Sequence, residues 1–316
     1  MSYHIQIITN AADMPDCKPQ SLFNTPAWMR LYDNVPQARA FAVCAFDNNF
    51  QLSGLQGFVL MHYYPALPAC LGTLCLAMAA PQFWISPSEQ TECYAAMLQI
   101  VYRYCKGRAV RIEVRHIAEQ SPLRHAFEQH AFNILPWYNI KNTLNKSHGN
   151  VTCGITRNRQ RQWQRARDAH VQIITGGTMA QRSVFYDILH QLYHRIHRPC
   201  PHTALFEHIA SNQHGEILLA LYHDNVIGGA VCLHYGETSY LYYIATLHKD
   251  ARYRAYHPST ALICEILQRA AQRGETCFDF LGAGSQQSTY GVRNFKLDFG
   301  GTLVKEMRCR KLVWPF

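Results

Sequence analysis

The chain has 316 residues, a length at which globular proteins usually divide into two domains. Hydrophobic residues make up 48% of it and charged residues 16%, which excludes a disordered or fibrous protein. A formal net charge of +9 favours an anionic partner, such as nucleic acid, a nucleotide-linked small molecule or a phosphorylated cofactor.

In chain order, the first half alternates helices and strands. Residues 21–35 predict a helix with Thr25 as its N-cap and Pro26 at its first position. The other elements of this half are a strand pair, an amphipathic helix with Ser88 as its N-cap, and a further strand, over residues 38–47, 51–64, 87–107 and 109–116. Such an alternation is typical of an α/β or α+β domain.

The polar, turn-rich stretch 139–154 predicts a boundary near residue 150, which gives domains 1–150 and 151–316. The second half then predicts a basic helix leading into a strand, a helix ended by Pro199, three antiparallel strands, a helix and two strands, over residues 156–174, 180–199, 215–246, 257–274, 276–282 and 301–314. The two halves show no sequence repeat, but their order of elements suggests a repeat of architecture.

No targeting or membrane-spanning segment is predicted. The first ten residues, MSYHIQIITN, lack the basic start and the apolar core of a signal peptide. The most apolar stretch, residues 69–85, is too short for a membrane span and contains glycine and proline. We therefore expect a soluble cytoplasmic protein, whose twelve scattered cysteines are mostly buried free thiols and not a disulfide framework.

Four segments resemble the Gcn5-related N-acyltransferase (GNAT) superfamily, and in particular its Fem-like branch, which places two such domains in tandem. The two specific segments are the helix-strand unit 253–284 and YGVRNFKLDFGG at 290–301, which is similar to the closing phenylalanine-lysine signature of the branch. The supporting segments are FNTPAWMRLY at 23–32 and the basic helix 157–173.

The resemblance implies a mixed α/β fold with two tandem GNAT-like domains, the second carrying the active site. Fem enzymes, which are bacterial, move an amino acid from aminoacyl-tRNA onto an amine of a peptidoglycan precursor, and their relatives use acyl-CoA. It thus implies an N-acyltransferase with no tightly bound cofactor, acting on an anionic or nucleotide-linked substrate, with acyl-CoA or aminoacyl-tRNA as co-substrate and tRNA as a potential partner.

The turn before the helix 257–274 departs from the acyl-CoA branch. That branch holds pyrophosphate on a glycine-rich turn, whereas this chain has RYRAYHPST at the same place. We expect the side chains of Arg252 and Arg254 and the helix N-terminus at Ser259 to bind phosphate instead. The departure favours the Fem-like branch without deciding the donor.

Lys296 is the main catalytic candidate, because the family signature places its lysine here and a fixed cation stabilises the oxyanion formed in acyl transfer. Asp279 could accept the proton of the attacking amine, or could instead pair with a basic side chain at a strand end. Tyr290 is a further proton carrier, Tyr242 and Tyr243 are donor contacts, and each could equally be a packing residue.

Arg157, Arg161 and Arg165 are spaced by four and share one face of the basic helix, where three guanidinium groups suit a row of phosphates. Phe295 is expected to contact the substrate beside them. The alternative for the arginines is a solvated helix face. The His-rich stretch 194–202 matches no zinc pattern, so no metal site is predicted.

Two functions from different classes remain open on these residues. The first is an N-acyltransferase with Lys296 at the reacting carbonyl. The second is a non-catalytic nucleotide- or RNA-binding module on the same fold, in which Lys296 only contacts phosphate.

Overall fold

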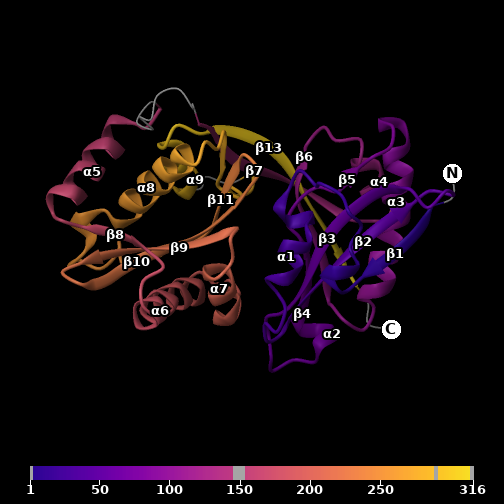
Figure 1. The fold of residues 1–316 in the computed structure, drawn as a ribbon, viewed down its shortest axis with the longest axis horizontal. Coiled ribbons are helices and arrows are strands. Elements are labelled where there is room, and N and C mark those ends of the chain that lie inside the picture. Colours follow the sequence, from indigo (N-terminus) through magenta and orange to yellow (C-terminus); the bar gives the residue numbers. More distant parts are fainter. Residues whose placement is uncertain (1–2, 145–153, 288–290, 314–316) are drawn as a thin grey trace. The chain divides into compact units, whose positions relative to one another are not determined.

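A computed structural model describes residues 3–144, 154–287 and 291–313, and groups them into two compact units. Unit 1 comprises the described residues up to Tyr138, together with Ser285–Gln287 and the residues from Lys305 onward. Unit 2 comprises the remainder, from Asn139 (Figure 1). The predicted boundary at residue 150 falls outside the described residues, so a division into 1–150 and 151–316 stays a prediction.

Unit 1 contains a mixed sheet in the order β1-β2-β3-β4-β6-β13. Only β4 and β6 run parallel, with α3 between them in sequence, while β5 pairs with β3 outside this order. The elements are β1 (His4–Ile8), α1 (Pro26–Arg30), β2 (Ala38–Phe46), β3 (Leu52–His62), α2 (Ala69–Gly72), β4 (Thr73–Ala77), β5 (Gln82–Phe83), α3 (Pro87–Cys105), β6 (Arg111–Ala118), α4 (Arg124–Gln129) and β13 (Thr302–Leu312).

Unit 2 repeats this plan with the strand order β8-β9-β10-β11-β12-β7. Again one pair is parallel, β11 with β12, and a helix, α8, connects its two strands. The elements are β7 (Asn133–Thr143), α5 (Arg157–Asp168), β8 (Gln172–Thr175), α6 (Met179–Arg195), α7 (Thr203–Ala210), β9 (Gly215–Tyr222), β10 (Asn225–Tyr235), β11 (Thr238–Thr246), α8 (Pro258–Gln272), β12 (Cys277–Asp279) and α9 (Gly291–Leu297). The expected repeat of architecture is therefore present.

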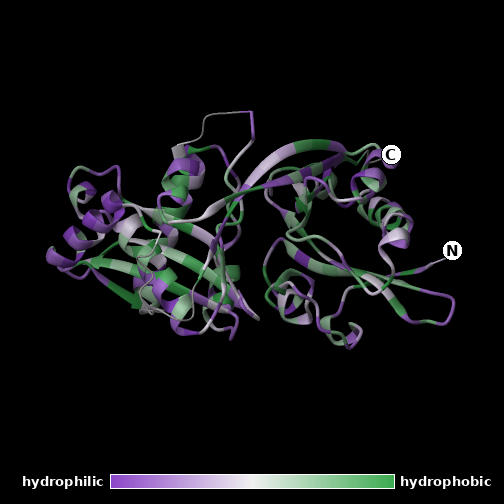
Figure 2. Ribbon diagram, turned by 90° about the horizontal axis from the view of Figure 1, so that it is seen from above, coloured by the Kyte–Doolittle hydropathy of each residue, from purple (hydrophilic) through white to green (hydrophobic). Residues whose placement is uncertain are grey.

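The sheet of unit 2 is covered on both faces. Figure 1 shows α6 and α7 on one face and α8, with α5 beyond it, on the other. Its central strands are mainly hydrophobic, as Figure 2 shows, because strands buried on both faces have no solvent-facing positions. In β10 this produces an unbroken buried run from Val226 to Leu233.

Gly229 of β10 lies directly against Phe185 of α6. A methyl group added there would lie 2.7 Å from the ring of Phe185 and 2.8 Å from the carbonyl oxygen of Leu218. Both neighbours are fixed, the first in the core and the second in the strand ladder, so the helix would have to move.

We expect Gly229→Ala to destabilise unit 2 by about 1–3 kcal/mol, because over-packing a filled core displaces its neighbours. Gly291→Ala is the matched control, since a methyl group there meets nothing within 4 Å. Urea denaturation of both variants measures the difference. Equal urea midpoints for the two variants would show that α6 can move to accommodate the methyl group without loss of stability.

Most predicted elements are present, with three differences. The helix expected over 21–35 is an α-helix only at Pro26–Arg30, although Thr25 caps it as predicted and its Oγ1 accepts from the N–H of Trp28. Ser86, not Ser88, is the N-cap of α3. Strands β1, β4, β5 and β7 and helices α2, α4, α7 and α9 were not predicted as separate elements. Among the described residues, no helix is long and apolar enough to cross a membrane.

Candidate active site in unit 2

The candidate site lies where two parallel strands separate. β11 and β12 pair over only three residues, from Thr238 opposite Cys277 to Tyr240 opposite Asp279. Beyond that point β11 continues to Thr246, whereas the chain after Asp279 turns away. The space left between them is a cavity of about 960 Å³.

The lining of this cavity is basic. Among the described residues it includes Arg159, Arg198, Arg254 and Lys296 but no aspartate or glutamate. A cavity with four cationic side chains and no carboxylate suits an anionic ligand. Six of the predicted site residues line it, namely Tyr242, Tyr243, Arg254, Ser259, Phe295 and Lys296.

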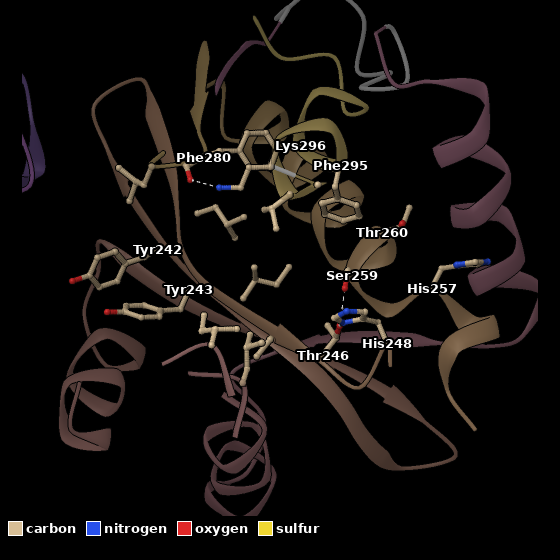
Figure 3. A pocket seen from close by; sticks show the side chains of 18 of the residues that line it. Tyr242, Tyr243, Thr246, His248, His257, Ser259, Thr260, Phe280, Phe295 and Lys296 are labelled. Carbon is tan, nitrogen blue, oxygen red and sulfur yellow. Dashed lines mark hydrogen bonds between the residues drawn. The ribbon is translucent and has the colours of Figure 1, made fainter. Parts of the chain in front are cut away.

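Lys296 is held on α9 by the turn that follows β12. Its Nζ donates to the carbonyl oxygens of Phe280 (3.0 Å) and Gly282 (2.6 Å), and the first of these bonds is drawn in Figure 3. Arg293, one turn earlier on α9, donates from Nε to the carbonyl oxygen of Ala283 at 3.0 Å. The glycine-rich turn therefore does not cradle phosphate, because its carbonyl groups hold two cations in place.

The ammonium group of Lys296 is partly buried, and this burial lowers its pKa to about 8, while the negative charge of Asp279 opposes the shift. An ammonium group has three N–H donors. Two of them bond to the carbonyls of Phe280 and Gly282, which leaves one for a ligand in the cavity. This geometry suits stabilisation of an oxyanion.

Asp279 does not line the cavity. Its carboxylate accepts from the side-chain amide of Asn139 (2.9 Å) and from the N–H of Leu281 (2.7 Å), and it lies 3.4 Å from Nζ of Lys141. These contacts match the alternative of a paired, turn-capping carboxylate, and acceptance of a proton by Asp279 stays a prediction without geometric support. Tyr290 lies outside the described residues.

A β-bulge explains why two consecutive tyrosines line the cavity. Val231 of β10 pairs with Tyr243, and the next residue, Cys232, pairs with Leu241, so Tyr242 is an extra residue in β11. A bulge turns neighbouring side chains toward the same side of a strand. The rings of Tyr242 and Tyr243 lie 4.7 Å apart, together at one end of the cavity (Figure 3).

The N-terminus of α8 forms the other end. The Oγ atoms of Ser259 and Thr246 lie 2.6 Å apart, and Thr246 Oγ1 lies 3.1 Å from Nδ1 of His248, so three cavity residues form one chain (Figure 3). Burial lowers the pKa of His248 and favours its neutral form. Arg254 lines the cavity nearby, whereas Arg252 does not and pairs instead with Asp250 at 2.7 Å.

The backbone of the turn before α8 offers little to a phosphate group. The N–H groups of Tyr253 and Arg254 both donate to the carbonyl of Asp250, and those of Tyr256 and His257 donate within the same turn. His257 takes up a left-handed conformation, with φ +47°. A phosphate group at this end would therefore have to be held by side chains, and whether one binds here stays a prediction.

The basic helix α5 turns a different face to the cavity from the one expected. Arg157, Arg161 and Arg165 are exposed, and none of them lines the cavity. Arg159 lines it instead, its guanidinium 4.4 Å from the ring centre of Phe295 and its Nε donating to Asp298 at 3.1 Å. The i, i+4 spacing identified the arginines that share a face but could not show which face packs against α9.

Solved structures of other proteins have a similar fold. A search of curated proteins finds no match. The structure is similar to that of FemX, with a TM-score of 0.65 and 13% identity over 98% of this chain and 97% of the other. It is also similar to a tandem GNAT protein from the clavulanic acid biosynthesis pathway, with a TM-score of 0.59 and 7% identity over 99% and 100% of the two chains. L-PGS from Bacillus licheniformis matches with a TM-score of 0.57 and 9% identity over 92% and 93%.

The model of the acetyltransferase (GNAT) domain family matches residues 108–296. This span includes the whole cavity lining, from Arg159 to Lys296, and more than half of the chain. The predicted fold class, two tandem GNAT-like domains in a mixed α/β arrangement, is confirmed, and so is the prediction of an enzyme over that of a binding module. The protein belongs to the GNAT acetyltransferase family and is an acyltransferase.

Proposed function

We propose that the cavity of unit 2 binds the activated end of an aminoacyl-tRNA and transfers its aminoacyl group to the amine of an anionic, cell-wall-type acceptor in a bacterial cytoplasm. One observation carries the proposal: the ammonium group of Lys296, with one N–H left for a ligand, lines a basic cavity that contains no carboxylate among its described residues.

The choice of donor is supported by the turn before α8. An acyl-CoA would present a pyrophosphate, which GNAT domains of the acyl-CoA branch bind with backbone N–H groups. In this turn the N–H groups of Tyr253, Arg254, Tyr256 and His257 are bonded within the chain. Separate guanidinium groups, such as those of Arg159 and Arg254, suit the spaced phosphates of an RNA 3′ end.

The reaction follows from the positions of these groups. The neutral acceptor amine attacks the ester carbonyl, a C–N bond forms, and negative charge develops on the carbonyl oxygen, where the remaining N–H of Lys296 stabilises it. The C–O bond to the ribose then breaks, and the ribose oxygen takes up the proton that the amine loses. Tyr242 and Tyr243 border the space for the aminoacyl side chain, and positioning supplies much of the rate.

Product analysis tests the proposal. The protein is incubated with radiolabelled aminoacyl-tRNA or with acetyl-CoA, in each case with a UDP-linked muropeptide as acceptor. We expect label from aminoacyl-tRNA in an amide that resists mild alkali, which hydrolyses the ester. Transfer from acetyl-CoA alone would replace the proposed donor, and transfer from neither would refute the proposed pair of substrates.

Arg159 provides a second prediction at this site. We expect Arg159→Gln to weaken binding of aminoacyl-tRNA about tenfold, because a charge-assisted contact in the cavity is lost and α5 loses its bond to Asp298. Arg161→Gln removes the same charge from the exposed face of α5 and should leave affinity within about twofold. Filter binding at one salt concentration measures both. A larger loss of affinity in Arg161→Gln than in Arg159→Gln would instead support Arg157, Arg161 and Arg165 as the phosphate-binding face.

A further inference from the structure

The connection between β3 and β4 in unit 1, a loop that ends in the short helix α2, is exposed and apolar. Its ten residues, 63–72, read YYPALPACLG and carry no charge and no polar side chain other than two tyrosine hydroxyls. Tyr64, Leu67 and Leu71 are 49%, 46% and 45% exposed. Surface loops are usually polar, so a cluster of large apolar side chains at a loop tip indicates a binding surface.

Half of the eight backbone N–H groups of this loop are hydrogen-bonded within the chain. Tyr63 donates to the carbonyl of Gly72 at 3.1 Å, Leu67 to that of Tyr64 at 2.9 Å, and Leu71 to that of Pro68 at 2.9 Å. Two prolines in the loop have no N–H at all. Four N–H groups of the ten residues would still lose water if the loop entered a medium without water, which lowers but does not remove the main cost of burying a loop in lipid.

Basic side chains surround the base of the loop. The N–H of Val110 donates to the carbonyl of Thr73, at the end of the loop, so the start of β6 lies beside it. Arg111 pairs with Leu74, two residues after the end of the loop, and Lys106 and Arg108 are exposed just before β6. Arg310 of β13 lies at the same end of the sheet. It pairs with Glu113, and Leu312, two residues further along β13, pairs with Arg111.

The four arginines on this face of the sheet share a single carboxylate. Arg111, Arg115, Arg308 and Arg310 all lie within 3.6 Å of a carboxylate oxygen of Glu113, which is buried between them. Lys106 and Arg108, exposed just before β6, place further positive charge at this end of unit 1, beside the apolar loop.

An apolar tip with a basic rim matches the surface of a bilayer that contains anionic phospholipid, where acyl chains begin just below a layer of phosphate groups. We propose that unit 1 binds such a surface, with Tyr64, Leu67 and Leu71 in the acyl boundary and the rim of Lys106, Arg108, Arg111 and Arg310 at the headgroup phosphates. The inference is independent of the reaction carried out in unit 2.

Vesicle sedimentation of the full chain tests this proposal. We expect binding to phosphatidylcholine vesicles that contain phosphatidylglycerol, weaker binding to pure phosphatidylcholine, and weakening at high salt. The double variant Leu67→Asp/Leu71→Asp should bind about tenfold more weakly or not at all. Met179→Asp/Val184→Asp places the same charges on exposed apolar positions of α6 and should bind as the wild type does.

A second pair of variants tests the basic rim without disturbing the ion pairs of Glu113. Lys106→Gln/Arg108→Gln should weaken binding to anionic vesicles about tenfold and reduce its salt dependence, whereas Lys18→Gln/Lys249→Gln, also at exposed positions, should have little effect. Melting temperatures of all variants show whether each is folded. Leu67→Trp adds a direct readout, since its fluorescence should shift to shorter wavelength when vesicles are added.

Three outcomes would overturn the proposal. The wild type fails to sediment with anionic vesicles, or the loop variant sediments equally well. Alternatively, ultracentrifugation shows a dimer that Leu67→Asp/Leu71→Asp dissociates while vesicles remain unbound, which would make the loop an interface between copies. Binding of inorganic pyrophosphate without binding of vesicles would likewise assign the basic rim to a soluble ligand.

Discussion

Lys296→Met is expected to lower kcat about 10²–10³-fold while leaving the affinity for aminoacyl-tRNA within about twofold. Methionine keeps most of the volume of the side chain but removes the N–H that stabilises the oxyanion, a group needed only in the transition state. Single-turnover rates and filter binding separate the two effects. Lys249→Met, at an exposed position that does not line the cavity, is the control and should retain full activity.

The role proposed for Lys296 also predicts how the reaction rate depends on pH. The acceptor amine reacts only when neutral, so the rate first rises with pH. The pKa of Lys296 is about 8, so its positive charge is lost as the pH rises through that value, and the rate then falls. We therefore expect a bell-shaped profile for the wild type.

Lys296→Arg tests the alkaline limb alone. An arginine stays charged far above pH 8, so the fall of the wild-type profile should disappear, even if the maximal rate is lower because the longer side chain sits differently. An unchanged alkaline limb would assign it to another group. A loss of tRNA affinity in proportion to the loss of rate in Lys296→Met would make Lys296 a phosphate contact and not a catalytic residue.

Glu113→Gln is expected to destabilise unit 1 by about 3–5 kcal/mol, which is the second large effect. Glu113 is only 1% exposed and lies among Arg111, Arg115, Arg308 and Arg310. Burial alone would raise its pKa, but Arg115, Arg308 and Arg310 outweigh this and hold it at about 2, below the ordinary 4.5. Without the carboxylate, four partly buried guanidinium groups lose the negative charge that they share.

The ionisation of Glu113 also makes the stability of unit 1 depend on pH. Because the folded state holds the pKa of Glu113 below 4.5, its contribution is complete above pH 4.5 and is lost as the pH falls toward about 2. The difference corresponds to about 3 kcal/mol. The stability of unit 1 should therefore fall less steeply with acid in Glu113→Gln than in the wild type.

Urea denaturation followed by tryptophan fluorescence measures both effects. Trp28, Trp84 and Trp137 belong to unit 1 and Trp163 to unit 2, so the transition of unit 1 is followed in a Trp163→Phe background. Glu128→Gln is the control, because Glu128 is 46% exposed and pairs with Arg124 within one helix, an arrangement worth only about 0.5 kcal/mol. A loss in Glu113→Gln no greater than that of the control would show that the arginines do not need their carboxylate.

The site could be predicted from the sequence only where local pattern and signature agreed. Lys296 and Phe295 stand in a family signature, and both line the cavity. Arg159 was missed because four-residue spacing shows which arginines share a face of a helix but not which face is covered. Arg159 shares a helix face with Gln162, three residues later, and both residues line the cavity. The sequence contains no pattern that singles out this face.

Asp279 and the turn after it show a second limit. A carboxylate between two phenylalanines could be a buried base or a capped strand end, and its partners Asn139 and Lys141 lie about 140 residues away in sequence. Helix α9 is seven residues long, too short to be recognised by its periodicity. Its position depends on Lys296 and Arg293 bonding to carbonyl groups of the preceding turn.

Periodicity, caps and signatures are local properties, so they were sufficient to predict the main helices and strands of unit 2, the tandem GNAT architecture and the lysine at the centre of the proposed reaction. The folded chain was needed to show which arginine enters the cavity, that one carboxylate contacts four guanidinium groups, and that an apolar loop lies at the same end of unit 1. Each of these depends on residues that are distant along the chain and meet only when strands such as β6 and β13 pair.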